Sequence, residues 1–157
     1  MKKIIFDDPY TRKSAIDKDN EELYDIQNHK AYLHNIVYNI DHSYNTIIKR
    51  QIKQKFYSSK SQDKIKNKYD ETQHITLEEL LSKLYDCNLK CYYCDCDLKI
   101  IYKGKGEKNQ WSLERLDNNV GHYGSNTCIS CLECNLTRNT GNYEYFKMGK
   151  QMKIKKV

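Results

Sequence analysis

Two pairs of cysteines with the spacing Cys-x-x-Cys are the residues of this sequence best suited to chemistry. The first pair is Cys91 and Cys94 in the run CYYC, and the second is Cys131 and Cys134 in the run CLEC. Thiolates at this spacing lie on a tight turn, from which both sulfur atoms reach one ion, and two such turns complete a tetrahedral zinc site. The sequence therefore predicts one structural zinc ion, held by these four cysteines.

Three other cysteines leave alternatives open. Cys96 closely follows the first pair and could compete as a ligand. Cys128 stands three residues before Cys131, but it falls on an expected strand and is interpreted as a small buried residue. Cys87 is expected to pack at the end of a helix. A redox dithiol is the other use of a Cys-x-x-Cys pair, but the second pair and the lack of a thioredoxin-like βαβ pattern in the sequence favour metal.

Composition limits the functions that the chain can have. It has 157 residues, a net charge of +6, 38% hydrophobic residues and a mean hydropathy of −0.92. This length allows one domain with an extension, and the low hydrophobic content predicts a small core that a metal ion helps to stabilise. The sequence has no ordinary signal peptide, no membrane-spanning stretch and an odd number of cysteines. We therefore expect an intracellular protein of the cytoplasm or nucleus.

A basic band extends from residue 49 to residue 68, where Asp63 is the one acid among nine charged residues. Such a band is typical of a protein that binds a polyanion, although a solvated helix face gives the same pattern. We predict DNA as the partner. The residues expected to contact DNA are Lys49, Arg50, Lys53, Lys55, Lys60, Lys64, Lys66 and Lys68, together with Arg138 beyond the band.

Helices are expected to dominate the first half of the chain. Apolar residues recur at helical spacing from about residue 21 to residue 56, as one helix or as two separated near residues 39–45. Residues 58–64 are interpreted as a basic loop. In the run HITLEELLSKLYDC, Thr76 and Glu79 predict a capping box for a helix that delivers the chain to the first cysteine pair.

Strands and short helices are expected in the second half. The sequence predicts a short strand and a flexible loop in 97–110, strands in 111–117 and 126–130, and helices beginning near 131 and 143. The predicted fold class is therefore α+β. We expect a mainly helical basic extension over residues 1–72, a zinc-stapled domain over 73–146 and a basic tail over 147–157.

The run WSLERLDNNVGHYGSNTCISCLECNLTRN, with CYYC before it, resembles the zinc-stapled kind of HNH endonuclease domain. The similarity covers about residues 75–140 and includes the LERLD strand, the GHYGSN turn and the CLECN pair. It implies a ββα-metal core, in which two strands and a helix surround one catalytic Mg²⁺ or Mn²⁺ ion. It also implies hydrolysis of phosphodiester bonds in DNA, by nicking or by double-strand cleavage.

The resemblance assigns roles to three residues. Glu114 occupies the first ligand position of the catalytic ion, Asn135 occupies the last, and Asn126 is the asparagine that steadies the loop between them. Oxygen ligands suit a hard divalent ion, which neutralises the charge that develops on the phosphodiester while a base activates water. The zinc ion then only fixes the helix that carries Asn135 against the hairpin that carries Glu114.

The general base stays open, because Arg115 stands where many family members have a histidine. His122 and Asp117 are the two candidates, and Asp117 is also a candidate second ligand of the catalytic ion. Arg115 would instead clamp a phosphate with its forked donors. A solvated turn histidine and a turn-initiating acid are the structural alternatives for the two candidates. His29 and His74 are interpreted as polar surface.

Two other functions compete with the nuclease. A zinc module that binds nucleic acid without cutting it would have kept the fold and lost the base. A zinc domain for protein interaction is the third reading, which the basic band disfavours. A homodimer would let two single-strand cuts make a double-strand break, but nothing in the sequence decides the oligomeric state.

Overall fold

The computed structural model describes residues 19–157, so the part of the predicted extension that falls on residues 1–18 lies outside the described residues. The fold class is α+β, as predicted, with one small antiparallel sheet. The helices are α1 (Glu21–Tyr24), α2 (Ile26–Val37), α3 (Asn45–Ile65), α4 (Leu77–Asp86), α5 (Leu132–Arg138) and α6 (Tyr143–Gln151). The strands are β1 (Trp111–Arg115) and β2 (Thr127–Cys131), and the short 3-10 helix η1 (Gly124–Asn126) precedes β2.

The apolar pattern of residues 21–56 corresponds to separate helices, because residues 38–44 are not helical and separate α2 from α3. Asn39 in this break has a φ of 53°, a left-handed conformation that asparagine tolerates better than most residues. The predicted break near residues 39–45 is therefore confirmed, although the short helix α1 is also separate from α2.

Helix α3 is longer than the sequence indicated. Residues 58–64, predicted as a loop, form its last turns. The buried face of the helix continues from Phe56 through Ser59 to Asp63 at helical spacing. Because those last two residues are polar, a hydrophobic pattern does not reveal them.

Helix α4 begins as predicted. The side chain of Thr76 accepts a hydrogen bond from the Glu79 amide (3.1 Å), and the Glu79 carboxylate accepts one from the Thr76 amide (2.8 Å). These bonds satisfy two of the free N–H groups at the helix start. The helix ends at Asp86, five residues before Cys91, the first cysteine of the predicted pairs.

The two strands form a hairpin with Trp111 opposite Cys131 and Arg115 opposite Thr127. Helix α5 follows β2 directly, with Cys131 as its N-cap. The short strand predicted in residues 97–110 is wrong: there the structure has only isolated bridges, at Asp97 and between Lys99 and Gln110.

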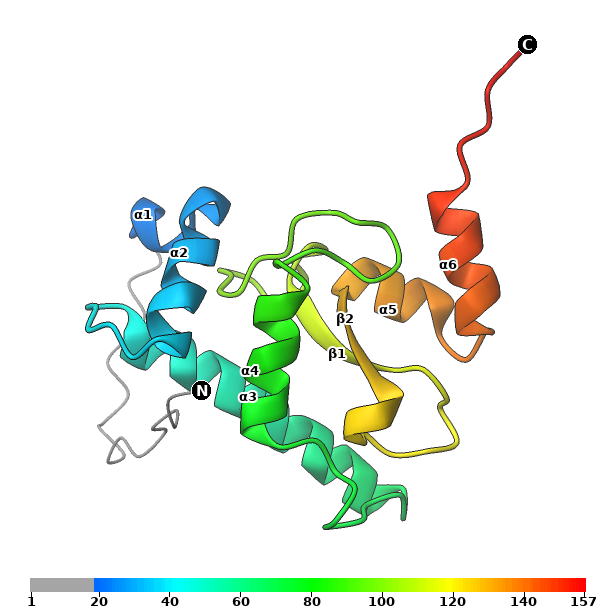
Figure 1. The fold of residues 1–157 in the computed structure, drawn as a ribbon, viewed down its shortest axis with the longest axis horizontal. Coiled ribbons are helices and arrows are strands. Elements are labelled where there is room, and N and C mark those ends of the chain that lie inside the picture. The colour runs from blue at the N-terminus through cyan, green and yellow to red at the C-terminus, as the bar shows by residue number, and fades with distance from the viewer. Residues whose placement is uncertain (1–18) are drawn as a thin grey trace.

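One apolar core joins these elements. Helix α3 packs against α2, α4 and β1, and α5 packs against both strands. Figure 1 shows α3 running past α4 toward the hairpin, with α1 and α2 at one end of the molecule and α6 at the other. The core cluster extends from Leu23 on α1 to Cys134 on α5, so it is continuous across the expected boundary near residue 72.

His29 is a core residue, and its interpretation as polar surface is wrong. Its Nδ1 accepts a hydrogen bond from the Ile100 amide (3.0 Å), and its Nε2 donates to the Leu23 carbonyl (3.2 Å). Burial lowers the pKa of His29 to about 4, so the ring is neutral at neutral pH.

Across residues 19–157, none of the helices combines the length and the apolar composition needed to cross a lipid bilayer.

Candidate functional site

A cluster of cysteines lies where the hairpin meets the segment after α4. The Sγ atoms of Cys91, Cys94, Cys96 and Cys131 lie within 4.8 Å of one another, an arrangement that could bind a metal ion such as zinc. The Sγ atoms of Cys94 and Cys131 are 3.9 Å apart. The alternative of Cys96 as a ligand is therefore supported by the geometry.

Cys134 adjoins the same cluster. Its amide donates a hydrogen bond to Cys131 Sγ (3.3 Å), and its thiol interacts with those of Cys131 and Cys94. Cys134, predicted as the fourth ligand, is therefore beside the group of four mutually close thiols but not a member of it, and Cys96 takes that place. Cys87, outside the cluster, donates its thiol proton to the Leu84 carbonyl (3.3 Å) at the end of α4, as expected for a packing residue.

Shared protons set the ionisation of these thiols. Hydrogen bonds from the Cys131 thiol and from backbone amides lower the pKa of Cys91 to about 5, although burial opposes this shift. The pKa of Cys131 is raised, because its thiol donates to Cys91 and is buried. One thiolate therefore forms readily, which suits a site whose metal ligands must be deprotonated.

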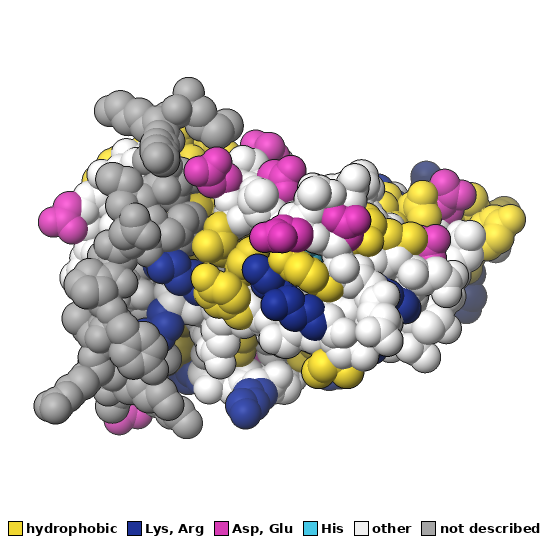
Figure 2. Space-filling view, turned by 90° about the horizontal axis from the view of Figure 1, so that it is seen from below, with side chains coloured by type: hydrophobic (Ala, Val, Ile, Leu, Met, Phe, Trp, Pro, Cys, Tyr) yellow, Lys and Arg dark blue, Asp and Glu magenta, His cyan; other side chains and the backbone are white. Residues whose placement is uncertain are grey.

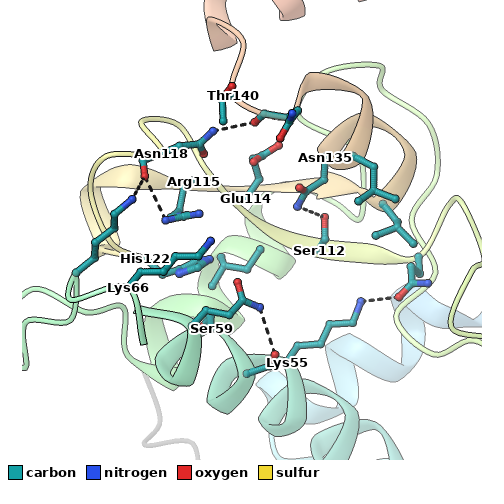
Figure 3. A pocket seen from close by; sticks show the side chains of 18 residues that line it. Lys55, Ser59, Lys66, Ser112, Glu114, Arg115, Asn118, His122, Asn135 and Thr140 are labelled. Atoms are coloured by element: carbon teal, nitrogen blue, oxygen red, sulfur yellow. Dashed lines mark hydrogen bonds between the residues drawn. The ribbon is translucent and has the colours of Figure 1, made fainter. Parts of the chain in front are cut away.

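A pocket of about 540 Å³ lies between α3 and the hairpin. Its walls come from α3, β1, the loop that follows β1, and α5 (Figure 3). Four of the residues predicted to be catalytic meet there: Glu114, Arg115, His122 and Asn135. The structure therefore brings together side chains from three separate segments, as a catalytic site requires.

Glu114 lies on β1 and is only 4% exposed. Its Oε1 accepts a hydrogen bond from Arg138 Nη2 (3.2 Å), whereas its buried Oε2 has no partner among the described residues. Burial raises the pKa of Glu114, although the neighbouring Arg138 opposes the shift. An unpaired buried carboxylate oxygen is costly, and a cation in the pocket would compensate it.

Asn135 reaches the same pocket from the first turns of α5. Its Nδ2 donates to Ser112 Oγ (3.1 Å), and Ser112 in turn donates to the Ser130 carbonyl (3.0 Å). This chain of bonds fixes the amide so that Oδ1 is the atom that Asn135 can offer to a cation. Figure 3 shows Glu114 and Asn135 on the wall of the pocket that β1 and α5 form, across from the side chains of α3.

His122 is neither solvated nor loose. It is 4% exposed, its backbone amide donates to Asp63 Oδ2 (2.6 Å), and its Nδ1 bonds to Asp63 Oδ1 (2.7 Å). Burial lowers its pKa, and the Asp63 carboxylate opposes this shift. The sequence offered only an indirect sign of the contact, since Asp63 stands 59 residues away and appeared as the one acid in a basic band. His74, interpreted as polar surface, is also buried, with Nε2 3.8 Å from Asp63 Oδ2.

Asp117 is not among the residues that line the pocket. Its exposed carboxylate accepts a hydrogen bond from the Asn119 amide (2.8 Å), which makes it a turn-initiating acid. Asn126 holds the same loop. Its side chain accepts from the Asp117 amide (2.9 Å) and donates to the carbonyls of Asp117 (2.9 Å) and Gly121 (3.1 Å).

Arg138 does not extend a DNA-binding face, because it is buried at the end of α5. Its guanidinium donates to the carbonyls of Leu116 (3.1 Å), Gly141 (2.7 Å) and Arg115 (2.6 Å), as well as to Glu114. These bonds tie α5 to the end of β1. The Nε of Arg138 has no partner among the described residues, but it is buried and does not face the surface. The sequence indicated only a further basic residue beyond the band.

The basic band divides between different surroundings. Lys55, Lys66 and Lys68 line the pocket. Lys55 is not a surface residue: its Nζ lies 4.7 Å from the Trp111 ring centroid and donates to the Trp111 carbonyl, and burial lowers its pKa to about 7. On the face drawn in Figure 2, basic side chains are interspersed with acidic and hydrophobic ones instead of forming one continuous patch.

Comparison with other proteins gives one informative similarity. A segment of 72 residues, 46% of this chain, is 39% identical to part of an uncharacterized protein of Acanthamoeba polyphaga mimivirus. The match spans 12% of that relative's length. No family model matches the chain. No solved structure matches it.

Proposed function

We propose that this protein is a metal-dependent DNA endonuclease of the HNH type. The observation that carries the proposal is the pocket in which Glu114, Asn135 and His122 converge among basic side chains. A ββα-metal core would consist of β1, β2 and α5, which follow one another in the order that the resemblance implies.

The donor atoms in the pocket fit a hard divalent ion. Glu114 offers an unpaired carboxylate oxygen and Asn135 an amide oxygen, the ligand types that Mg²⁺ and Mn²⁺ prefer. When bound, such an ion would neutralise charge on the phosphate that is cut. The cysteine cluster, with zinc, would hold the start of α5 and so keep Asn135 opposite Glu114.

The remaining lining suits a phosphodiester. Lys66, Lys68 and Arg115 supply positive charge, and Glu114 is the one acid among the described lining residues. Arg115 Nη1 also donates to the Asn118 carbonyl (3.3 Å), which directs its guanidinium along the pocket wall (Figure 3). Phosphate contacts of this kind make binding sequence-independent and sensitive to salt.

His122 is the general base in this proposal, because Asp117 points to solvent and His122 lines the pocket. Burial keeps its imidazole neutral near neutral pH, the state in which it can accept a proton from water. Arg115 then serves the phosphate and not the proton.

The test is incubation of supercoiled plasmid with the zinc-loaded protein at low salt, with Mg²⁺, Mn²⁺ or EDTA. We expect nicked or linear DNA that requires the divalent ion and is lost in Glu114→Gln and Asn135→Ala. Glu133→Gln is the matched control, since Glu133 is an exposed acid on α5 whose Lys108 ion pair lies at the surface. Cutting that survives both pocket variants would contradict the proposal.

A non-catalytic module that binds nucleic acid is the second candidate. The observation in its favour is the buried ion pair between Glu114 and Arg138, which occupies one of the two carboxylate oxygens. A mobility shift that weakens with salt, without cutting under any metal condition, would select this function.

A further inference from the structure

We infer that Asp63 on α3 is the positioning residue for His122, so that the N-terminal helical region completes the active site. This inference rests on the proposed nuclease function. It concerns a residue outside the hairpin and α5, which the resemblance does not cover. The geometry of the contact, the tautomer that it imposes and the shape of the adjoining loop each support it.

The contact between Asp63 and His122 consists of two hydrogen bonds and is buried. Asp63 is 0% exposed, and its two oxygens accept from one residue: Oδ1 from the His122 ring (2.7 Å) and Oδ2 from the His122 amide (2.6 Å). A buried carboxylate is costly unless it is fully hydrogen-bonded. Lysines neighbour Asp63 along α3, and they could pair with its carboxylate at the surface. The carboxylate instead points inward, to the loop that carries His122.

This contact selects one tautomer of His122. An ionised carboxylate only accepts hydrogen bonds, so the proton of the neutral ring must reside on Nδ1 and the lone pair on Nε2. Within residues 19–157, Nε2 of His122 makes no hydrogen bond to the protein, and the residue lines the pocket. The same division of labour operates where an aspartate stands behind a catalytic histidine in hydrolases.

The loop is shaped to reach Asp63. A Cβ atom on Gly121 would lie 2.8 Å from Asp63 Oδ2 and 2.4 Å from the Lys68 carbonyl, so only glycine permits this approach. Lys68 also binds the loop, since its Nζ donates to the Asn118 carbonyl. The end of α3 and the loop that carries His122 are therefore fitted to each other at several points.

The chemical step follows from this arrangement. A water oxygen forms a bond to phosphorus while His122 Nε2 takes a proton from that water. The bond from phosphorus to the leaving oxygen breaks, and the leaving oxygen takes a proton from solvent. Asp63 stays ionised and stabilises the imidazolium that forms. The charged and titratable groups facing His122 are Asp63, Arg115 on β1 and His74.

The test compares nicking rates of the zinc-loaded full chain across a range of pH, for wild type, Asp63→Asn, His122→Ala and the double variant. We expect Asp63→Asn to slow nicking by about 10- to 100-fold, and His122→Ala by about 100-fold or more. The double variant should be no slower than His122→Ala, because Asp63 acts through the ring. Glu78→Gln removes the same charge from an exposed site on α4 and should leave the rate unchanged.

The pH dependence separates positioning from mere support of the fold. The carboxylate raises the pKa of His122, so its loss in Asp63→Asn should move the acidic limb of the rate profile to lower pH. ¹⁵N NMR of the imidazole groups in the protein without DNA gives a readout that does not depend on activity. It should show His122 protonated on Nδ1 in wild type, with that preference lost in Asp63→Asn.

Two results would overturn the inference alone: a wild-type ring protonated on Nε2, or a cutting Asp63→Asn variant with an unchanged rate and pH limb. No cutting by wild type with any divalent ion would overturn the proposed function and this inference with it.

Discussion

The two ends of the β1–β2 hairpin are held by different chemistry. At the end where Trp111 faces Cys131, thiols converge on one point and can share a metal ion. At the end where Arg115 faces Thr127, the connecting loop is fixed by hydrogen bonds, above all those from His122 to Asp63. A soft-ligand cluster thus staples one end, and a polar network supplied by α3 holds the other.

This difference shows how the candidate pocket depends on the rest of the chain. The cysteine end uses residues of the hairpin and of the segment just before it, whereas the pocket end needs a helix 59 residues away. The first end is joined by thiols that can share a metal ion, whereas the second is joined by a hydrogen-bonded contact with α3. Variants at the two ends should therefore fail in different ways.

The largest effect is expected at the cysteine end. Cys91→Ser removes a clustered ligand, and structural zinc sites contribute on the order of 10 kcal/mol, comparable to the whole stability of a domain. The variant should lose bound zinc and its cooperative thermal transition. Cys87→Ser, outside the cluster, is the matched control and should retain both. Equal zinc content in the two variants would contradict a metal staple.

A smaller loss is expected from Gly121→Ala at the pocket end. The added methyl meets Asp63 and the Lys68 carbonyl, so the loop must move, at a cost of about 1–3 kcal/mol. Denaturant unfolding measures the change, and zinc content should stay normal. Gly149→Ala is the control with the opposite sign: it has open space on α6, where alanine should stabilise by up to about 1 kcal/mol.

A pH-dependent loss of stability should arise from His29, away from both ends. Its folded-state pKa is lowered to about 4, so the unfolded chain binds more protons between that value and its ordinary pKa of 6.5. Stability is therefore complete above pH 6.5 and falls as the pH drops toward 4. Urea unfolding at several pH values in this window gives the free energy of unfolding as a function of pH. This free energy should fall less steeply with decreasing pH in His29→Gln than in wild type. An equally steep fall in both would contradict the assignment.

The smallest effect concerns the contacts of the pocket with DNA. Lys66 is exposed at the pocket, so Lys66→Ala should reduce the salt dependence of DNA binding by about one phosphate contact. Lys105→Ala removes the same charge from an exposed loop outside the pocket and should leave the slope unchanged. The same salt dependence of DNA binding in both variants would indicate that DNA does not bind at the pocket.

The sequence predicted what lies in short, regular patterns. The Thr76–Glu79 capping box, the two strands and the approach of the cysteine pairs all follow from local spacing. The inclusion of Cys96 among the four closest thiols was only an open alternative, because spacing does not give sulfur positions in space.

The sequence did not predict contacts between distant polar residues. The buried residues in the last turns of α3 are Ser59 and Asp63. Because both are polar, the sequence of this segment resembles that of a loop. Asp63 meets His122, and Arg138 meets Glu114, only because tertiary packing buries them together. A lone acid within a basic band was the one available signal, since an unmatched charge of that kind has a reason to lie inside.

The most direct test of two different centres on one hairpin is anomalous diffraction from crystals of the zinc-loaded protein grown with Mn²⁺. The account predicts zinc at the cysteine cluster and manganese in the pocket, with oxygens of Glu114 and Asn135 within about 2.6 Å of the ion. A pocket without manganese, with Glu114 still bound only to Arg138, would contradict it.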